Sequence, residues 1–374
     1  MKKYFLLWAM AGMTATLSLT SCSDNDDAPK LIPVETSEGV FVINSGNQSG
    51  GIEGSLTYYD YATASAKQSV YKNANGEGLG VTSNHAVVYG SKIYIVGSGE
   101  QTVFVADRKT LKKITNISVK VNGEAAMPRQ AIAGYGYVFV STYSNAVVAI
   151  DTLTNSISKT YPCGYYTEGM AIYNGFLYTA DSNYGNGKQD NAGPSISAIS
   201  LTTGETATFT HNLINNPIDV KFAGGRLFVL DSGLYDANWN QVGAGLFEIV
   251  NGDVKLIADA TEMAVSNNKV FLFNAPYTYP ATTPTYKVFD TTSNKLTDLC
   301  DGSDIESPGK ISVDPVKGYV YITSYHMGDY GYADYKGNGY CVIYNENGNK
   351  QGQFDCSVGA GYVIPNTSIE YVQQ

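Results

Sequence analysis

The chain has 374 residues, a formal net charge of −10, and only 16% charged residues beside 39 glycines and 30 tyrosines. The acidic balance argues against nucleic acid or anionic lipid as a partner, because both require a basic face. Abundant glycine and tyrosine with few charges favours short strands and tight turns, so we expect an all-β protein. The length exceeds that of a usual single domain and indicates either two domains or one large repetitive β-structure.

The first 21 residues have the pattern of a bacterial signal peptide. Lys2 and Lys3 precede a mostly apolar stretch, residues 5–19, which is too short and interrupted for a stable membrane span. The following Leu19-Thr20-Ser21-Cys22 resembles the lipobox of lipoproteins, in which cleavage leaves the cysteine to carry diacylglycerol. We therefore expect residues 1–21 to be removed and Cys22 to be lipidated. The alternative is an ordinary secretory signal with an incidental cysteine.

Residues 22–38 are expected to form a flexible acidic tether. Ser23-Asp24-Asn25-Asp26-Asp27 has no hydrophobic anchor and resembles the export tag of Bacteroidota-type surface lipoproteins. The resemblance implies an outer-membrane lipoprotein that faces the cell exterior and touches the membrane only through its lipid. A plain solvated tether on the periplasmic side of that membrane is the alternative.

A strong alternation of aromatic and β-branched residues returns seven times in the remaining chain. These stretches are residues 39–44, 92–97, 137–142, 176–181, 226–231, 269–274 and 318–323. A weaker strand precedes each of them except the first, at residues 85–89, 130–133, 170–173, 218–222, 262–265 and 310–313. A shared repeat unit of this length indicates a single repetitive architecture.

The end of the chain supplies the strand that the first unit lacks. Residues 366–372 alternate like a strand but have no partner of their own. Pairing them with the first unit closes the ring and leaves no unpaired edge. We therefore predict a seven-bladed β-propeller over residues 39–374, closed by the C-terminal strand.

These repeats resemble those of the YVTN/YncE-type seven-bladed propellers over essentially the whole mature chain. Together with the lipobox, the acidic tether and the many tyrosines, they are similar in plan to the cobalamin-capturing BtuG-type lipoproteins. The resemblance implies capture of a small-molecule nutrient, cobalamin or another corrinoid, for delivery to a TonB-dependent outer-membrane transporter. A siderophore, a glycan or a protein partner are alternative ligands, and a propeller lyase or hydrolase is a further alternative.

The long connections of the predicted ring all emerge on one face. Loops from the second to the third strand of a blade share a face with the connections between blades. Five of these loops are long, at residues 45–55, 182–195, 232–245, 275–285 and 324–339, whereas the turns of the opposite face are short. Functional residues gather in loops on a rigid scaffold, so this face is the predicted binding face.

Aromatic side chains with polar tips are frequent in these loops and suit a broad, flat, amide-rimmed ligand such as a corrinoid. The candidate ligand-binding residues are Arg129, Tyr143, Tyr166, Tyr184, Tyr235, Trp239, Tyr277, Tyr279, Tyr325, His326, Tyr330 and Tyr332. Loop packing is the alternative role of each aromatic residue. Strand tyrosines such as Tyr94, Tyr178 and Tyr321 are expected to pack between blades.

The sequence offers no recognisable catalytic motif. The three histidines, His85, His211 and His326, lie in different units, and HExxH, GxSxG and phosphate-loop patterns are missing. Glu168 and Asp219 begin inner strands near the channel mouth, where an acid–base pair and a hydrogen-bonding role are both open. We expect no enzymatic activity, no catalytic residue and no cofactor.

No metal site is expected either. Asp181, Asn183 and Asp190 resemble the opening of a calcium loop, but the closing glutamate is missing and these residues also form plain turns. Of the cysteines after Cys22, none forms a metal-type pair, and their spacing leaves a disulfide open; they are Cys163, Cys300, Cys341 and Cys356.

Overall fold

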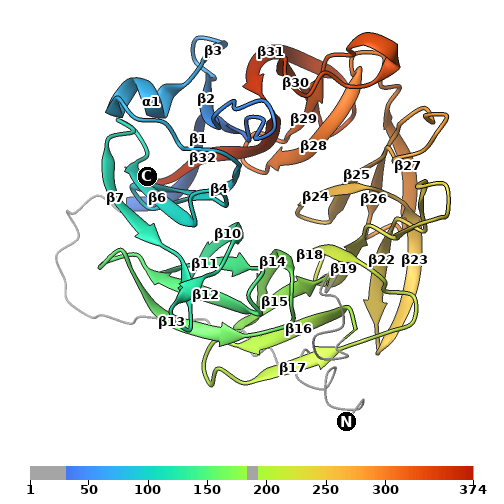
Figure 1. Cartoon of the computed structure of the whole chain (residues 1–374), viewed down its shortest axis with the longest axis horizontal. Helices are drawn as coiled ribbons and strands as arrows, with labels where there is room; N and C mark the ends of the chain where they lie inside the picture. Colours follow the sequence, from blue (N-terminus) through green and yellow to red (C-terminus); the bar gives the residue numbers. More distant parts are fainter. Residues whose placement is uncertain (1–30, 183–192, 374) are drawn as a thin grey trace.

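The computed structural model describes residues 31–182 and 193–373. Seven four-stranded antiparallel sheets surround a central axis (Figure 1), which confirms the predicted seven-bladed β-propeller. The expected signal peptide, Cys22 and the acidic run after it lie outside the described residues. In the described part of the chain, no helix is both long and apolar enough to cross a membrane.

The strands of each blade are designated A to D from the axis outward. Blade 1 contains β32 (Ala360–Gln373), β1 (Leu31–Asn44), β2 (Ser55–Asp60) and β3 (Ser65–Lys67). Blade 2 contains β4 (Ser83–Tyr89), β5 (Lys92–Gly97), β6 (Thr102–Asp107) and β7 (Lys113–Ser118). Blade 3 contains β10 (Pro128–Gly134), β11 (Tyr137–Thr142), β12 (Ala146–Asp151) and β13 (Ser156–Pro162). Blade 4 contains β14 (Thr167–Tyr173), β15 (Phe176–Asp181), β16 (Ser195–Ser200) and β17 (Thr206–Phe209). Blade 5 contains β18 (Pro217–Ala223), β19 (Arg226–Asp231), β22 (Gly245–Val250) and β23 (Asp253–Asp259). Blade 6 contains β24 (Glu262–Ser266), β25 (Lys269–Asn274), β26 (Thr285–Asp290) and β27 (Lys295–Cys300). Blade 7 contains β28 (Ser307–Asp314), β29 (Tyr319–Tyr325), β30 (Asn338–Asn345) and β31 (Lys350–Val358).

The B strands carry the strongest sequence signal because both of their faces are buried between neighbouring blades. In β5, for example, Ile93, Tyr94, Ile95 and Val96 are all fully buried. A nearly continuous run of apolar residues results, and it marks the strand clearly in the sequence. Five B strands accordingly have the predicted bounds: β5, β11, β15, β19 and β25.

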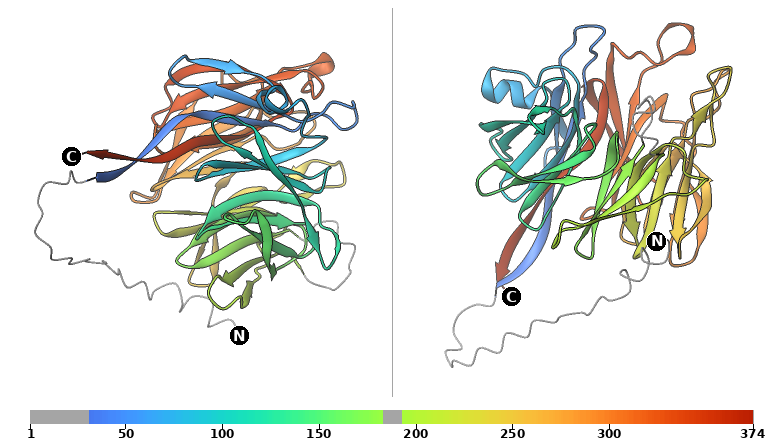
Figure 2. Two further views of the ribbon diagram at one scale, coloured as in Figure 1. Left: turned by 90° about the vertical axis from the view of Figure 1, so that its left-hand side faces the viewer. Right: turned by 60° about the horizontal axis from the view of Figure 1, so that its bottom comes forward.

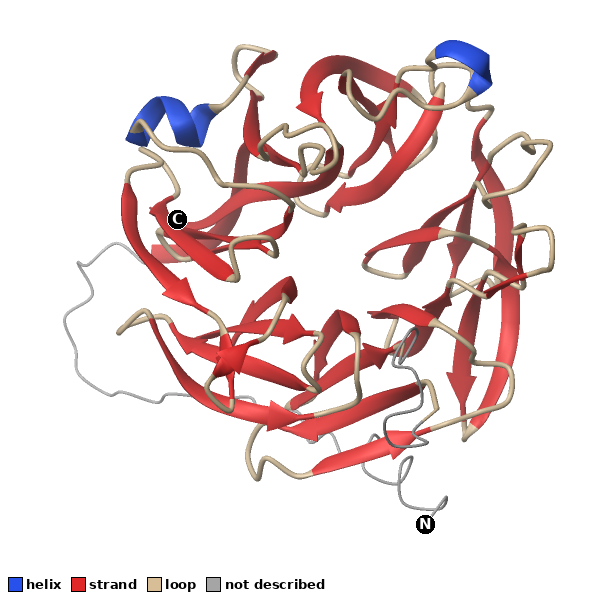
Figure 3. Cartoon of the chain, viewed as in Figure 1, coloured by secondary structure: helices blue, strands red, loops and turns tan. Residues whose placement is uncertain are grey.

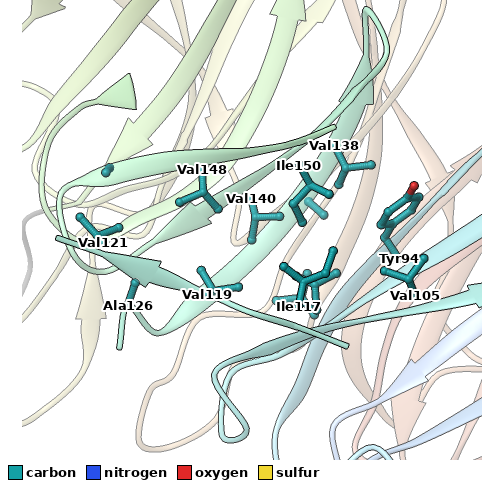
Figure 4. Packing of buried hydrophobic residues seen from close by; sticks show 14 residues of the cluster. Tyr94, Val105, Ile117, Val119, Val121, Ala126, Val138, Val140, Val148 and Ile150 are labelled. Carbon is teal, nitrogen blue, oxygen red and sulfur yellow. The ribbon is translucent and has the colours of Figure 1, made fainter. Parts of the chain in front are cut away.

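The hydrophobic core lies between adjacent blades. Tyr94 and Val105 of blade 2 face Val138 and Val140 of blade 3 in one such cluster (Figure 4). Tyr178 packs in the same way between blades 4 and 5, and Tyr321 between blades 7 and 1. Figure 3 shows that the blades of the ring consist of strands. Apolar side chains are therefore buried mainly between the facing surfaces of neighbouring blades.

The C-terminal strand closes the ring, but the closing residues differ from those predicted. Residues 360–365 lie at the axis and pair with β1 between Val40 and Asn44. The predicted strand at residues 366–372 belongs to the outer half of β32, where it pairs with residues 31–37. This two-stranded ribbon projects from the ring (Figure 2). β1 therefore begins at Leu31, within the stretch expected to be tether, because the end of β32 provides partners for its backbone.

The loops divide between the two faces as expected. The A–B turns are short, as at Gly90–Ser91 and Asn174–Gly175, whereas the long B–C loops share the opposite face with the connections between blades. We call the latter the loop face. Two connections on it contain unpredicted elements, namely helix α1 (Val70–Asn75) and the hairpin of β8 (Lys120–Val121) and β9 (Glu124–Ala125). Both are too short for a periodic pattern to show in the sequence.

Candidate functional site

A pocket of about 290 Å³ lies where the A strands of all seven blades begin, at the centre of the loop face. We call it the axial pocket. Each A strand contributes at least one polar side chain to its wall. In blade order from 1 to 7 these are Tyr362, Asn84, Arg129 with Gln130, Glu168, Asp219, Glu262 and Lys310.

Three ion pairs balance the charges of this wall. Arg129 Nε lies 3.1 Å from Glu168 Oε2, and Lys221 Nζ lies 2.6 Å from Asp219 Oδ1. Lys310 pairs with Glu262 across blades 7 and 6. Charges that are largely removed from water need such partners, because an unpaired buried charge is strongly destabilising. These three ion pairs thus place three positive and three negative groups, with no net charge, around the axial pocket.

Burial and ion pairing change the pKa values of the wall residues in opposite directions. Burial raises the pKa of Glu262, and Lys310 only partly offsets this effect. Burial disfavours the charged form of Lys310, but Glu262 and Tyr362 together raise its pKa above the ordinary value. Burial, with the nearby charges of Lys221 and Lys310, lowers the pKa of His85 to about 3, so this imidazole is neutral at physiological pH. The His85 ring packs edge-on against Tyr362, 4.7 Å between centroids.

Three residues of the predicted binding face are in contact with one another: Arg129, Tyr143 and Tyr166. The Arg129 guanidinium lies over the Tyr143 ring, 4.7 Å from its centroid, while its Nε donates to Glu168. The Tyr143 hydroxyl also donates to Glu168. Tyr166 packs on Tyr143 with 4.8 Å between ring centroids. Glu168 therefore fixes both the arginine and the tyrosine, and it is itself committed to these contacts.

Tyr325 joins the axial pocket to a second cavity. The neighbouring cavity, also about 290 Å³, shares Ser45, Tyr325 and Gly359 with it. Its wall is otherwise uncharged and is formed by Gly46, Asn47, Gln48, Ser49, Thr82 and Tyr335. Tyr335 meets Tyr325 edge-on, 5.0 Å between centroids, and is 58% exposed. The two cavities extend the site from the axis toward the loops of blades 7 and 1.

Four other predicted residues form a separate group on the loops of blades 5 and 6. We call Tyr235, Trp239, Tyr277 and Tyr279 the aromatic loop cluster; none of them lines the axial pocket. Backbone bonds join the two loops, with Gln241 N donating to Tyr277 O at 2.7 Å. Tyr279 N also donates to Asn240 Oδ1 at 2.8 Å. Trp239 is 72% and Tyr279 is 79% exposed, so the joined loops present these rings to solvent.

Of the remaining predicted residues, His326 and Tyr332 do not line the axial pocket. The exposed His326 pairs with Glu306, 2.8 Å from Nδ1 to Oε1, and its ring packs against Tyr340. Tyr332 is 57% exposed on the same loop. Tyr330 belongs to the short turn η1 (Asp329–Gly331), but its side chain lies outside the described part, as does the whole of Tyr184.

Several wall residues were not predicted from the sequence, among them Asn84, Glu262 and Lys310, and for three others the reason can be identified. Tyr362 lies in a segment that was not expected to be strand, so its place at the axis could not be inferred. Gln130 begins a predicted inner strand, but its polar side chain gave no sign that it faces the channel. Tyr335 shares its loop with Tyr325, and the density of tyrosines there was the only available signal.

The structure also bears on the metal and cysteine hypotheses. Asp181 is buried at the end of β15 and accepts hydrogen bonds from the hydroxyls of Thr167, Thr179 and Ser197. Asn183 and Asp190 lie outside the described residues. In the ranges 31–182 and 193–373, no cluster of three or more His, Cys, Asp or Glu residues is suited to a metal ion. The four cysteines in these ranges are free thiols.

The fold and site define a seven-bladed β-propeller with an electroneutral polar pocket at the centre of its loop face. Residues 38–132, which include the second half of β1, strands β2 and β3, the whole of blade 2 and the start of β10, match the model of a domain of unknown function (DUF5074). No curated protein matches the sequence.

Solved structures resemble the chain at low sequence identity. Hydrazine synthase of Kuenenia stuttgartiensis superposes with a TM-score of 0.56 at 13% identity, over 78% of this chain and 95% of that one. The computationally designed Ika8 protein has a TM-score of 0.46 at 10% identity, over 90% and 82% of the two chains. Streptogramin B lyase has a TM-score of 0.48 at 10% identity, over 74% and 83%. At such identities these similarities concern the fold alone.

Proposed function

We propose that the protein captures a small-molecule nutrient on its loop face, with the ligand lying across the mouth of the axial pocket. The observation that carries this proposal is the convergence of polar side chains from seven A strands, with an aromatic rim of Tyr143, Tyr166 and Tyr325 beside them. Concave sites with a few convergent polar groups are where small ligands usually bind. Tyr325 connects this pocket to the uncharged cavity beside it, which widens the available surface.

The size of the site favours a broad ligand that enters only in part. The axial pocket, about 290 Å³, is near the lower limit for sites that enclose a small molecule. A macrocycle would therefore rest on the rim and insert a substituent. A corrinoid with its amide side groups meets this requirement, and cobalamin is the ligand we propose, in keeping with the resemblance to BtuG-type proteins.

Surface display and delivery to a TonB-dependent transporter complete the proposal. The chain enters the ring through the ribbon of β1 and β32, and residue 31 lies at the end of β1 opposite the loop face. A lipid on Cys22 would therefore hold the ring with its loop face directed away from the membrane. This orientation suits a protein that takes a ligand from outside and passes it on.

Binding rather than catalysis is the proposed role of the axial pocket. Each of its three acids, Glu168, Asp219 and Glu262, already takes part in an ion pair. A general base must instead be available to the proton that it abstracts.

The aromatic loop cluster supports a second candidate function, which is contact with a glycan or a protein. Its rings are exposed and its two loops are hydrogen-bonded to each other, so little ordering would be required on binding. Exposed tyrosine and tryptophan provide large contact areas at low entropic cost.

A thermal-shift screen tests the proposal and its alternatives together. The protein is heated with cyanocobalamin, haem, a ferric siderophore or an oligosaccharide mixture. A ligand present at one hundred times its Kd stabilises the folded state by about 2.7 kcal/mol. We expect this stabilisation with cyanocobalamin and its reduction to about one third in Tyr325→Ala, as follows from a thirtyfold weaker affinity. Stabilisation by oligosaccharides alone would favour the second candidate, and no stabilisation by any compound would contradict small-molecule capture.

A further inference from the structure

Arg226 and Arg129, two of the three arginines of the chain, use their guanidinium groups differently. Arg226 is fully committed: Nε and Nη2 donate to Glu248 at 2.6 and 2.7 Å. Its Nη1 donates to Thr291 O and Asn294 Oδ1, each at 2.7 Å. These contacts connect β19 to the turn of the next blade. Arg226 therefore shows how this fold uses an arginine for structure alone.

Arg129 is held in a different way, through its Nε and the face of its guanidinium group. Its Nε donates to Glu168, and its plane is supported by Tyr143. Among the described residues, neither Nη1 nor Nη2 has a hydrogen-bond partner. The side chain is 24% exposed and lines the axial pocket. Four N–H donors of fixed geometry thus border a cavity whose other charged groups are paired.

We infer that the axial pocket binds an uncharged ligand through a carbonyl oxygen, which accepts hydrogen bonds from the terminal nitrogens of Arg129. The inference rests on the proposed function and specifies the chemical class of its ligand. A guanidinium fork matches a planar oxygen acceptor. The acids that line the pocket already accept hydrogen bonds from protein cations. The terminal nitrogens of Arg129 are therefore the charged wall groups that remain available to a ligand, and they act as hydrogen-bond donors.

Charge balance separates a neutral carbonyl from a carboxylate. Three cations already face three anions around the A strands. A carboxylate ligand would add a negative charge to this balanced, half-buried ring and would compete with Glu168 for Arg129. An amide or lactam oxygen satisfies the same donors without adding charge, and it therefore avoids the penalty of an uncompensated buried charge.

Arginine-selective NMR tests this inference without requiring the complete ligand. Protein labelled with [15N]arginine gives signals from Arg108, Arg129 and Arg226, and Arg129→Lys identifies the Arg129 signal by its loss. The probes are N-methylacetamide, sodium acetate and methylammonium chloride, added separately at constant ionic strength. We expect N-methylacetamide to shift the Arg129 signal and to leave the fully committed Arg226 unmoved.

A ligand-detected measurement provides the control. Saturation transfer from the protein to N-methylacetamide should fall at least severalfold in Arg129→Lys and remain unchanged in Lys92→Arg, a substitution on the opposite face. A response to acetate equal to or larger than that to the amide, a response to methylammonium alone, or no response would each overturn the inference. Failure of cyanocobalamin to bind would instead count against the corrinoid proposal, because the fragment experiment does not depend on it.

Discussion

Deleting the C-terminal strand in two steps separates its role in the ring from its role in the ribbon. The shorter deletion removes residues 367–374 and leaves residues 360–366 in place. The longer deletion also removes the ring-closing residues, including Ala360 and Val363, which are 1% and 2% exposed. It leaves the edge of β1 without a partner at Val40, Phe41, Val42 and Asn44.

The two deletions are expected to lower the free energy of unfolding by very different amounts. Burial of Val363 contributes roughly 1.5–3 kcal/mol, and each lost ladder hydrogen bond costs about 1 kcal/mol. With the loss of Ile364 and Tyr362 added, the longer deletion costs on the order of 5 kcal/mol or more, which approaches the entire stability of a typical domain. The ribbon residues are more exposed, Val34 at 39% and Ile369 at 64%, and their freed backbone groups can bond to water, so the shorter deletion should lower the free energy of unfolding much less than the longer one.

Thermal unfolding followed by circular dichroism, with size-exclusion chromatography for aggregation, distinguishes the variants. We expect the shorter variant to melt cooperatively within several degrees of the parent. The longer variant should aggregate or lack a cooperative transition, because the inner edge of β1 becomes unpaired. If the longer variant melts like the parent, ring closure by residues 360–365 does not stabilise the fold and the reasoning is refuted.

Three further predictions concern the anchor, the core and the axis. Cys22→Ala should abolish fatty-acid labelling and release the protein from the membrane fraction, and unchanged labelling would contradict lipidation. Tyr94→Ala should lower the free energy of unfolding by about 3–5 kcal/mol, as for a large core aromatic, while the folded fraction binds ligand normally; denaturant unfolding measures the loss. Because the pKa of His85 is lowered from 6.5 to about 3 in the folded state, the unfolded chain binds more protons between these values. Stability should therefore fall as pH decreases through this window, and His85→Gln should reduce the slope by up to about 1.4 kcal/mol per pH unit; equal slopes in both proteins would contradict a neutral buried His85.

The propeller was predictable because its B strands carry a local signal. Burial on both faces requires apolar residues at consecutive positions, and β5, β11, β15, β19 and β25 have the predicted bounds for this reason. The unpaired strand at the C-terminus also indicated closure. Its register was not predictable, because residues 360–365 include Gly361 and Pro365 and do not resemble a regular strand.

The sequence allowed us to predict on which face of the ring the site lies, but not which of the candidate residues meet at one pocket. Loop lengths and tyrosines indicated where ligand contacts could gather, and Arg129, Tyr143, Tyr166 and Tyr325 do lie in or beside the axial pocket. The separation of Trp239 from that pocket depends on how far each loop extends from the axis, which no local pattern encodes. Two of the three ion pairs are likewise long-range features, since they join residues of different blades.

Isothermal titration of cyanocobalamin into three proteins tests most directly whether the axial pocket is the ligand site. Loss of an aromatic hot spot costs about 2 kcal/mol or more, which is roughly thirtyfold in affinity. We predict micromolar or tighter binding to the parent protein, a thirtyfold loss in Tyr325→Ala, and nearly unchanged affinity in Trp239→Ala. No binding to the parent would contradict the corrinoid assignment. Weaker binding in Trp239→Ala with unchanged affinity in Tyr325→Ala would place the ligand on the aromatic loop cluster and contradict the axial site.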